Sequence, residues 1–300
     1  IGDSTTTLAL VAVTRDAASA PRTNAVWALG RIRDGRGFAA AHRALEDPDP
    51  MVRDAAAEAL GQFDSTAAIA ALMRRLRQDD AASVRRTAAW ALAQLDAMQA
   101  SSALADALQS DADASVREMS AWALGNIEHS DGITALTEAL RRDASAPVRE
   151  MAAWALGELE AESASAVLGE AVTGDRSADV RATSAWALGQ LEPERAPRGL
   201  ISAVGDADAN VRLNAAWALS EIGDSAALPA LRTALQRETG DRARRAMLRA
   251  VIRSGEGVER LAEMFTSPNV RDREMVTRAL AGRPHLDPWP WPMPRPRPFP

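Results

Sequence analysis

Apolar side chains recur at helical spacing in short segments that come in pairs. Residues 65–78 carry one such stripe, formed by Ile69, Leu72, Met73 and Leu76. A polar turn follows at residues 79–83, and a second stripe then runs through Val84, Ala88, Ala91, Leu92 and Leu95. The pattern predicts two helices joined by a short turn, which is a helical hairpin of about 32 residues.

The same hairpin pattern repeats along the chain. A Val-Arg pair returns every 31 or 32 residues, at Val52-Arg53, Val84-Arg85, Val116-Arg117, Val148-Arg149, Val180-Arg181 and Val211-Arg212. Five residues before each Val stands an Asp: Asp47, Asp79, Asp111, Asp143, Asp175 and Asp206. Weaker copies centre on Pro21-Arg22, Ala243-Arg244 and Asp272-Arg273. A fixed period of this length is typical of stacked repeats, so we predict an all-α array of eight to nine hairpins over residues 1–283.

Polar residues mark where each second helix begins. Three residues before the Val stand Asp49, Asp113, Ser145, Ser177 and Asp208. Such side chains accept hydrogen bonds from the free N–H groups of a helix start, and we expect all five to be N-caps. Pro50 follows Asp49 at the first helical position, where proline is favoured.

The repeated pattern D-x4-V-R-x2-A-A-W-A-L-G-x-[LI] resembles the HEAT-like repeats named after the phycobilisome lyases, over roughly residues 2–283. The resemblance implies a right-handed α-α superhelix, that is, a HEAT-like solenoid. It also implies that the turn Asp and the second-helix Arg form a ladder between neighbouring repeats. The alternative, an Arg row that captures anions, is weaker because every Arg has its own Asp.

Six tryptophans occupy one repeat position, six residues after the anchor: Trp27, Trp90, Trp122, Trp154, Trp186 and Trp217. On a helical wheel, Trp90 points roughly 145° away from the core direction, toward the concave surface that second helices line in a solenoid. The same position holds Glu58, Arg249 and Arg278 in other repeats, which argues against full burial. Two compatible interpretations remain. The indoles seal the seam between repeats, or they form an aromatic stripe that contacts a ligand.

Polar residues flank the tryptophan row. One turn further on lie Gln94, Asn126, Glu158, Gln190 and Glu221, and one turn before lie Arg86, Glu118 and Glu150. An aromatic floor edged with amides and carboxylates suits an extended peptide, a Pro-rich segment or basic side chains. Arg245, Arg249 and Arg253 form a basic stripe that we interpret as a solvated face.

The last 17 residues, 284–300, alternate Pro with large or cationic residues. This composition excludes a helix or a central strand and favours polyproline II. We expect this tail to dock on protein surface through Trp289, Trp291 and Phe299, in the same chain, in a second copy by self-association, or in a partner. The alternative is an extended terminus ordered only by local contacts.

Composition narrows the function. The net charge is −6, and all 35 basic residues are Arg, so a general nucleic-acid binder is disfavoured. The chain has no Cys and three His, His42, His129 and His285, which lack metal-ligand spacing. No nucleophile elbow, H-E-x-x-H motif or phosphate-cradling Gly loop occurs, and no run is apolar enough for a membrane span. We therefore expect no cofactor, no metal and no enzymatic activity, while the bacterial compartment stays open.

These observations favour a non-catalytic scaffold that binds a protein or peptide in a Trp-lined groove. Repeats such as Val148 to Gly157, with a Pro/Arg-rich end, also resemble segments appended to bacterial BlaR-type membrane metallopeptidases. That resemblance implies a sensor or regulatory portion of a larger membrane-associated protein. HEAT-like DNA glycosylases and phycobilin lyases are enzymatic alternatives, but the acidic charge opposes the first, and the regular Trp row and tail have no role in the second.

Overall fold

The computed structural model describes residues 4–127, 129–257, 266–268 and 270–280, and the regular elements within these ranges are helices. The chain divides into two compact units between Ala139 and Leu140. The tail and its expected anchors Trp289, Trp291 and Phe299 lie outside the described residues.

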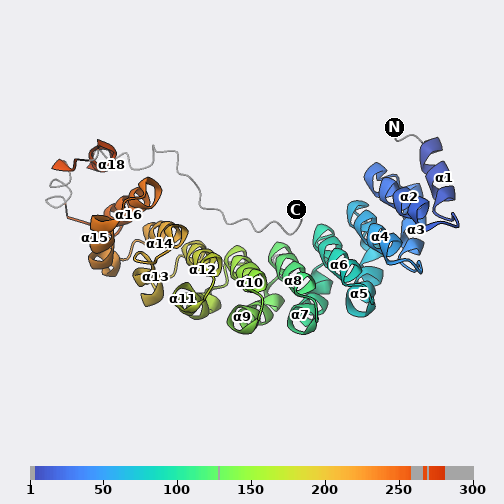
Figure 1. The fold of residues 1–300 in the computed structure, drawn as a ribbon, viewed down its shortest axis with the longest axis horizontal. Coiled ribbons are helices and arrows are strands. Elements are labelled where there is room, and N and C mark those ends of the chain that lie inside the picture. Colours follow the sequence, from blue (N-terminus) through green and yellow to red (C-terminus); the bar gives the residue numbers. More distant parts are fainter. Residues whose placement is uncertain (1–3, 128, 258–265, 269, 281–300) are drawn as a thin grey trace. The chain divides into compact units, whose positions relative to one another are not determined.

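Unit 1 is a stack of helical hairpins. Its helices are α1 (Ser4–Val13), α2 (Ser19–Ile32), α3 (Phe38–Ala44), α4 (Pro50–Gln62), α5 (Ile69–Gln78), α6 (Ala82–Gln94), α7 (Ser101–Ser110) and α8 (Ala114–Asn126). The second helices α2, α4, α6 and α8 each pack on the next and form one layer, and the first helices form the other (Figure 1). The core lies between the layers and is built from Ala, Leu and Val side chains.

Unit 2 follows the same plan. Helix α9 (Ile133–Arg142) spans the division between the units. The remaining helices are α10 (Ala146–Glu158), α11 (Ser165–Gly174), α12 (Ala178–Leu191), α13 (Arg198–Ala203), α14 (Ala209–Ile222), α15 (Leu228–Arg237), α16 (Asp241–Arg253) and α18 (Val270–Leu280). Here the second helices α10, α12, α14, α16 and α18 pack in sequence order. The repeated hairpins and all-α solenoid-like class predicted from the period are confirmed.

Short 3-10 turns lead into most first helices. They are η1 (Gly35–Gly37), η2 (Thr66–Ala68), η3 (Met98–Ala100), η4 (Ser130–Gly132), η5 (Glu162–Ala164) and η6 (Ser225–Ala227). The preceding second helix ends at a residue with positive φ, and this position recurs at Arg33, Asp64, Asp96, Glu160, Glu192, Gly223 and Gly255. At these seven positions the left-handed residue reverses the chain at the end of a hairpin. Only Gly adopts this conformation without steric cost, so the five non-Gly cases carry strain.

The predicted N-caps are confirmed where the residue is Asp. Asp49, Asp113 and Asp208 accept hydrogen bonds from the backbone N–H of Met51, Ser115 and Asn210 at 2.8–2.9 Å. Ser145 and Ser177 occupy the same cap position but make no side-chain cap hydrogen bond, so for them the prediction was wrong. In those two turns, Asp143 and Asp175 accept from the N–H groups of Ser145 and Ser177, both at 2.8 Å.

The expected Arg–Asp ladder joins neighbouring repeats within each unit. Arg53 contacts Asp79 through Nε and Nη2 at 2.8 and 2.7 Å, and its Nη1 donates to the carbonyls of Asp47 and Pro48. The same bidentate contact links Arg22 to Asp47, Arg85 to Asp111, Arg149 to Asp175, Arg181 to Asp206, Arg212 to Glu238 and Arg244 to Asp272. These guanidiniums are committed to structural pairs, which opposes the alternative of an anion-binding Arg row.

The glycines of the W-A-L-G segments, and Gly61 at the same position of an E-A-L-G segment, lie where neighbouring second helices approach closely. A Cβ at Gly30 would stand 2.6 Å from Cα of Ala59, and a Cβ at Gly61 would stand 3.0 Å from Cα of Ala91. Only a residue without a side chain permits this approach. These contacts confirm that the glycines serve helix packing.

Candidate functional site

The second-helix face consists of the residues two, six and ten positions after the anchor of each second helix. In unit 1 these are Thr23, Trp27 and Arg31 on α2, Asp54, Glu58 and Gln62 on α4, Arg86, Trp90 and Gln94 on α6, and Glu118, Trp122 and Asn126 on α8. A spacing of four residues keeps three side chains on one side of a helix. The tryptophan row occupies the middle position of each triplet.

Aromatic surface is exposed on this face of unit 1. Trp27 is 49% exposed, and Trp90 and Trp122 are half-buried. The Trp27 indole acts against the raised pKa of Glu58 on α4, and the guanidinium of Arg31 lies 5.8 Å from the centre of the Trp27 ring. Trp27 therefore lies beside one carboxylate across the α2–α4 seam and one cation on its own helix.

The tryptophans of unit 2 differ among themselves. Trp154 is half-buried, whereas Trp186 and Trp217 are only 3% and 4% exposed. The ring of Trp186 lies against Gly157 and that of Trp217 against Gly189, where an added Cβ would stand 2.8 and 2.3 Å from Cζ3. Trp186 and Trp217 are thus core side chains in the seams between repeats, and we leave them out of the candidate site.

The polar edge of the row is exposed along most of its length. Gln94, Asn126, Glu158 and Gln190 are exposed, and Asn126 donates to the carbonyl of Trp122 at 2.8 Å. Glu221 is half-buried and accepts from Arg249 at 3.3 Å. Arg245, in the same basic stripe as Arg249, donates to the carbonyl of Asp241 at 3.3 Å.

Two carboxyls on the unit 1 face are held in an unfavourable environment. Burial raises the pKa of Glu58, and the charge of Asp54 raises it further, while the Trp27 indole and Arg31 act in the opposite direction. Burial also raises the pKa of Glu118, which Arg86 partly offsets. Oδ1 of Asp54 is buried and accepts no hydrogen bond from the described residues. A cation that reached these groups would relieve an electrostatic cost.

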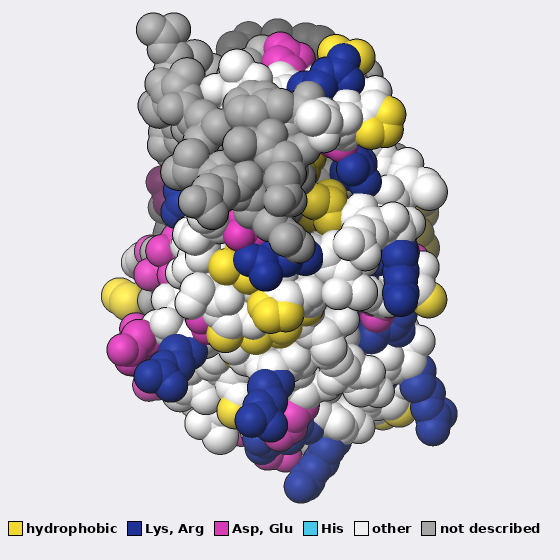
Figure 2. All heavy atoms as spheres, turned by 90° about the vertical axis from the view of Figure 1, so that its left-hand side faces the viewer, with side chains coloured by type: hydrophobic (Ala, Val, Ile, Leu, Met, Phe, Trp, Pro, Cys, Tyr) yellow, Lys and Arg dark blue, Asp and Glu magenta, His cyan; other side chains and the backbone are white. Residues whose placement is uncertain are grey.

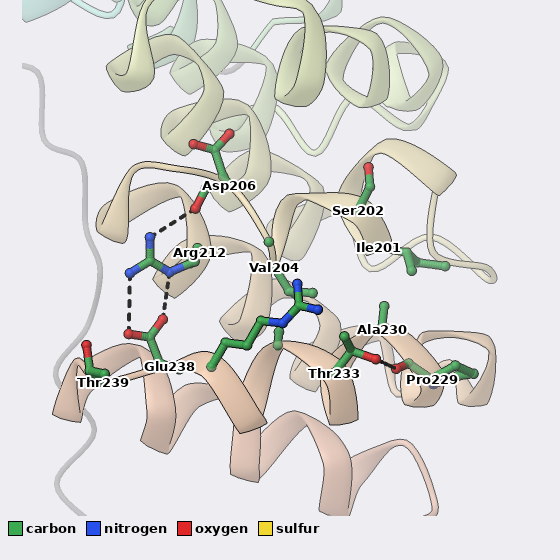
Figure 3. Close-up of a pocket in the computed structure, with 13 residues that line it drawn as sticks. Ile201, Ser202, Val204, Asp206, Arg212, Pro229, Ala230, Thr233, Glu238 and Thr239 are labelled. Carbon is green, nitrogen blue, oxygen red and sulfur yellow. Dashed lines mark hydrogen bonds and ion pairs between the residues drawn. The ribbon is translucent and has the colours of Figure 1, made fainter.

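A separate cavity of about 700 Å³ lies between α13 and α15 (Figure 3). In the wall of this cavity, Arg212 donates hydrogen bonds to the carboxylate of Glu238 at 2.6 Å and to the carbonyl of Asp206 at 2.9 Å. The hydroxyl of Thr233 donates to the carbonyl of Pro229 at 2.9 Å. The cavity forms beside α13, which has 6 residues where α11 and α15 have 10. The 31-residue spacing from Val180 to Val211 is the sequence signal of this shortened repeat.

Charges of both signs are interleaved on the face that Figure 2 shows. Figure 2 shows Arg side chains at several separate places, with Asp or Glu beside several of them, rather than one broad basic patch. Within the part of the chain that the structure describes, no group of three or more His, Asp and Glu side chains is arranged to hold a metal ion. None of the described helices has the length and apolar character needed to cross a membrane.

Comparison with known proteins identifies the repeat. The family model for HEAT repeats matches residues 7–93, 101–189 and 165–252, and the model for the PBS lyase HEAT-like repeat matches residues 84–110. No curated protein sequence matches the chain.

Several solved structures are similar. YibA of Escherichia coli shares 22% identity over 83% of this chain and 92% of its own, with a TM-score of 0.59. The CpcE–CpcF complex of phycocyanin lyase from Nostoc shares 22% identity over 82% of this chain and 94% of that one, with a TM-score of 0.47. Human deoxyhypusine hydroxylase shares 23% identity over 72% and 84%, with a TM-score of 0.36. At these identities, the likeness to YibA supports the fold alone.

Proposed function

Because the chain belongs to the HEAT repeat family, we propose that it is a non-catalytic interaction scaffold that binds a protein or peptide segment on its second-helix face. The observation that carries the proposal is the exposure of Trp27 at 49%, with half-buried Trp90 and Trp122 at the same position of other repeats in unit 1. Tryptophans that are partly exposed beside polar groups are the side chains that most often anchor protein interfaces.

The chemistry beside the tryptophans supports a polypeptide ligand. Exposed amides at Gln94 and Asn126 are able to pair with a ligand backbone, and the carboxyls of Glu58 and Glu118 are able to pair with its cations. The guanidiniums of the ladder are already paired with Asp and Glu, and the net charge is −6. These features disfavour binding of a nucleic-acid phosphate backbone. Trp154 extends the proposed contact set into unit 2 as a separate surface.

The test is a Trp27→Ala variant. The intact chain is used to capture a partner from a lysate of the source organism, and the purified partner is then titrated against both forms. Since truncation of an interface tryptophan costs about 2 kcal/mol or more, affinity is expected to fall at least about 30-fold.

The matched control is Met98→Ala. Met98 is also an exposed apolar side chain, at 56%, but it lies in η3, away from the second-helix face. This variant is expected to bind like the native chain. Equal affinity of the native chain and Trp27→Ala would contradict a site on this face, and equal losses from both variants would indicate a non-specific apolar contact.

A further inference from the structure

The α2–α4 part of the second-helix face is suited to a guanidinium. The cluster holds two carboxylates, Asp54 and Glu58, and one cation, Arg31, so its net charge is about −1 when both acids are ionised. Oδ1 of Asp54 is buried and receives no hydrogen bond from the described residues. Arg31 shows what the cluster accepts, because its guanidinium lies 5.8 Å from the Trp27 ring centre and lowers the pKa of Glu58.

The chain carries a segment of complementary chemistry. Residues 288–300 contain two cations, Arg295 and Arg297, and no acid, and every second residue is Pro. Such a sequence favours polyproline II, whose low conformational entropy suits it to aromatic-lined surfaces. The segment thus offers guanidiniums and aromatic rings to a face that offers carboxylates and aromatic rings.

The pitch of a polyproline II segment also matches the spacing between neighbouring second helices. Polyproline II advances about 9 Å in each turn of three residues. Neighbouring packed helices lie about 8–10 Å apart, and the close contact of Gly61 with Ala91 places α4 and α6 in that class. One edge of the segment then carries Trp289 and Arg295, two turns apart, and a second edge carries Trp291 and Arg297. An arginine at α4 therefore places the tryptophan of its own edge at α8, beside half-buried Trp122.

We propose that residues 284–300, the Pro/Arg segment of this chain, bind the second-helix face of unit 1, with Arg295 or Arg297 beside Glu58 and Asp54. This inference rests on the proposed function, since it names an occupant of the same face. Binding within one chain and binding between two copies use the same chemistry, and both support the proposal.

The experiment uses the full chain with a benzophenone amino acid in place of Phe299. After irradiation, cross-links are mapped by mass spectrometry, and gel mobility separates links within a chain from links between chains. We expect links to residues of α2 and α4, because position 299 lies two or four residues past the arginine, on the side away from the tryptophan at α8. Asp54→Asn combined with Glu58→Gln removes the carboxylate acceptors and is expected to lower the yield about tenfold, as for the loss of a hydrogen bond to a charged group.

The matched control removes the same charge elsewhere. Glu162→Gln combined with Glu170→Gln changes two exposed carboxyls in η5 and α11 and is expected to leave the yield unchanged. A second variant, Arg295→Ala combined with Arg297→Ala, changes only the segment and is expected to lower the yield as much as the Asp54/Glu58 variant does. Because it leaves the repeats untouched, its result does not depend on the folding of an α4 variant.

The inference is overturned if links map only to other surfaces, if none form, or if neither the acid nor the arginine changes reduce the yield. In that event, a partner whose affinity still depends on Trp27 leaves the scaffold function standing and assigns the face to another ligand. If partner binding is also independent of Trp27, the proposed function fails as well.

Discussion

At the positive-φ positions between hairpins, the steric cost of a side chain in the folded state opposes the entropy cost of a glycine in the unfolded chain. Glu160 has φ of 46° and is exposed. At the equivalent position Gly223 and Gly255 adopt the same conformation with φ of 69° and 83°. A Cβ in this region costs about 1–2 kcal/mol, whereas Gly costs less in the folded state and more in unfolded-chain entropy.

Glu160→Gly is therefore expected to raise the free energy of unfolding by about 0.5–1 kcal/mol. The substitution removes the steric cost in the folded state, and the greater conformational entropy of glycine in the unfolded chain offsets part of that gain. Urea denaturation followed by circular dichroism measures the change. The control is Glu170→Gly, an exposed position inside α11, where the same substitution is expected to cost about 1 kcal/mol. A loss of stability at both positions would show that strain at Glu160 is negligible.

At the scale of the element, the Arg–Asp ladder makes the joining of hairpins dependent on pH. Burial alone would raise the pKa of Asp79, but the hydrogen bonds and charge of Arg53 and the N–H of Ala81 lower it overall. The pKa values of Asp111, Asp175 and Asp206 are lowered in the same way by their Arg partners. A carboxyl with a lowered pKa stabilises the fold above its unfolded pKa of about 3.9, and this stabilisation is lost as the pH falls through the folded value.

Asp79→Asn tests the ladder at its most buried pair, in which the side chains of Arg53 and Asp79 are 9% and 0% exposed. The variant removes the bidentate carboxylate partner of a buried guanidinium, which then keeps the exposed Asp80 as its carboxylate partner, and it is expected to cost about 3 kcal/mol at pH 7. The difference from the native chain should shrink below about pH 4, where Asp79 of the unfolded chain takes up a proton, and should vanish once the pH falls through the lowered pKa of Asp79 in the folded chain. Glu46→Gln, in an exposed pair with Arg75, should cost less than about 1 kcal/mol. A difference that stays constant down to pH 3 would argue against an ionic contribution.

The ladder and the hairpins could be predicted from the sequence because each is encoded within one period. Asp49, Asp113 and Asp208 carry their capping acceptor in their own side chain, so the period was enough to identify them. The burial of Trp186 and Trp217 could not be predicted in this way. The two rings lie against Gly157 and Gly189 of the preceding repeat, yet half-buried Trp90 lies against Gly61 in the same way, so the difference in burial is not encoded within one repeat. The cavity beside α13 likewise required the lengths of three first helices together.

At the scale of the whole molecule, the hairpins of each unit contact chiefly their neighbours in that unit, as the sequential packing of α10, α12, α14 and α16 shows. The free energy of unfolding of such an array is close to the sum of the stabilities of its repeats and of the interfaces between neighbours. Local unfolding therefore spreads only as far as the interfaces couple one repeat to the next. A defect at one seam should therefore be felt in the adjoining helices and fade within a few repeats. The interface between α12 and α14 is a suitable place to introduce such a packing defect.

Gly189→Ala would place a Cβ 2.3 Å from Cζ3 of Trp217 and 2.9 Å from Cα of Ala218, and such overpacking costs about 1–3 kcal/mol. Hydrogen exchange read by mass spectrometry is expected to accelerate in α12 and α14, while peptides of α2, α4 and α6 keep their native rates. Gly174→Ala, where nothing lies within 4 Å of the added Cβ, should leave all rates close to native. Uniform acceleration in both units would mean that the array opens as one cooperative body, and the additive description of its repeats would then be wrong.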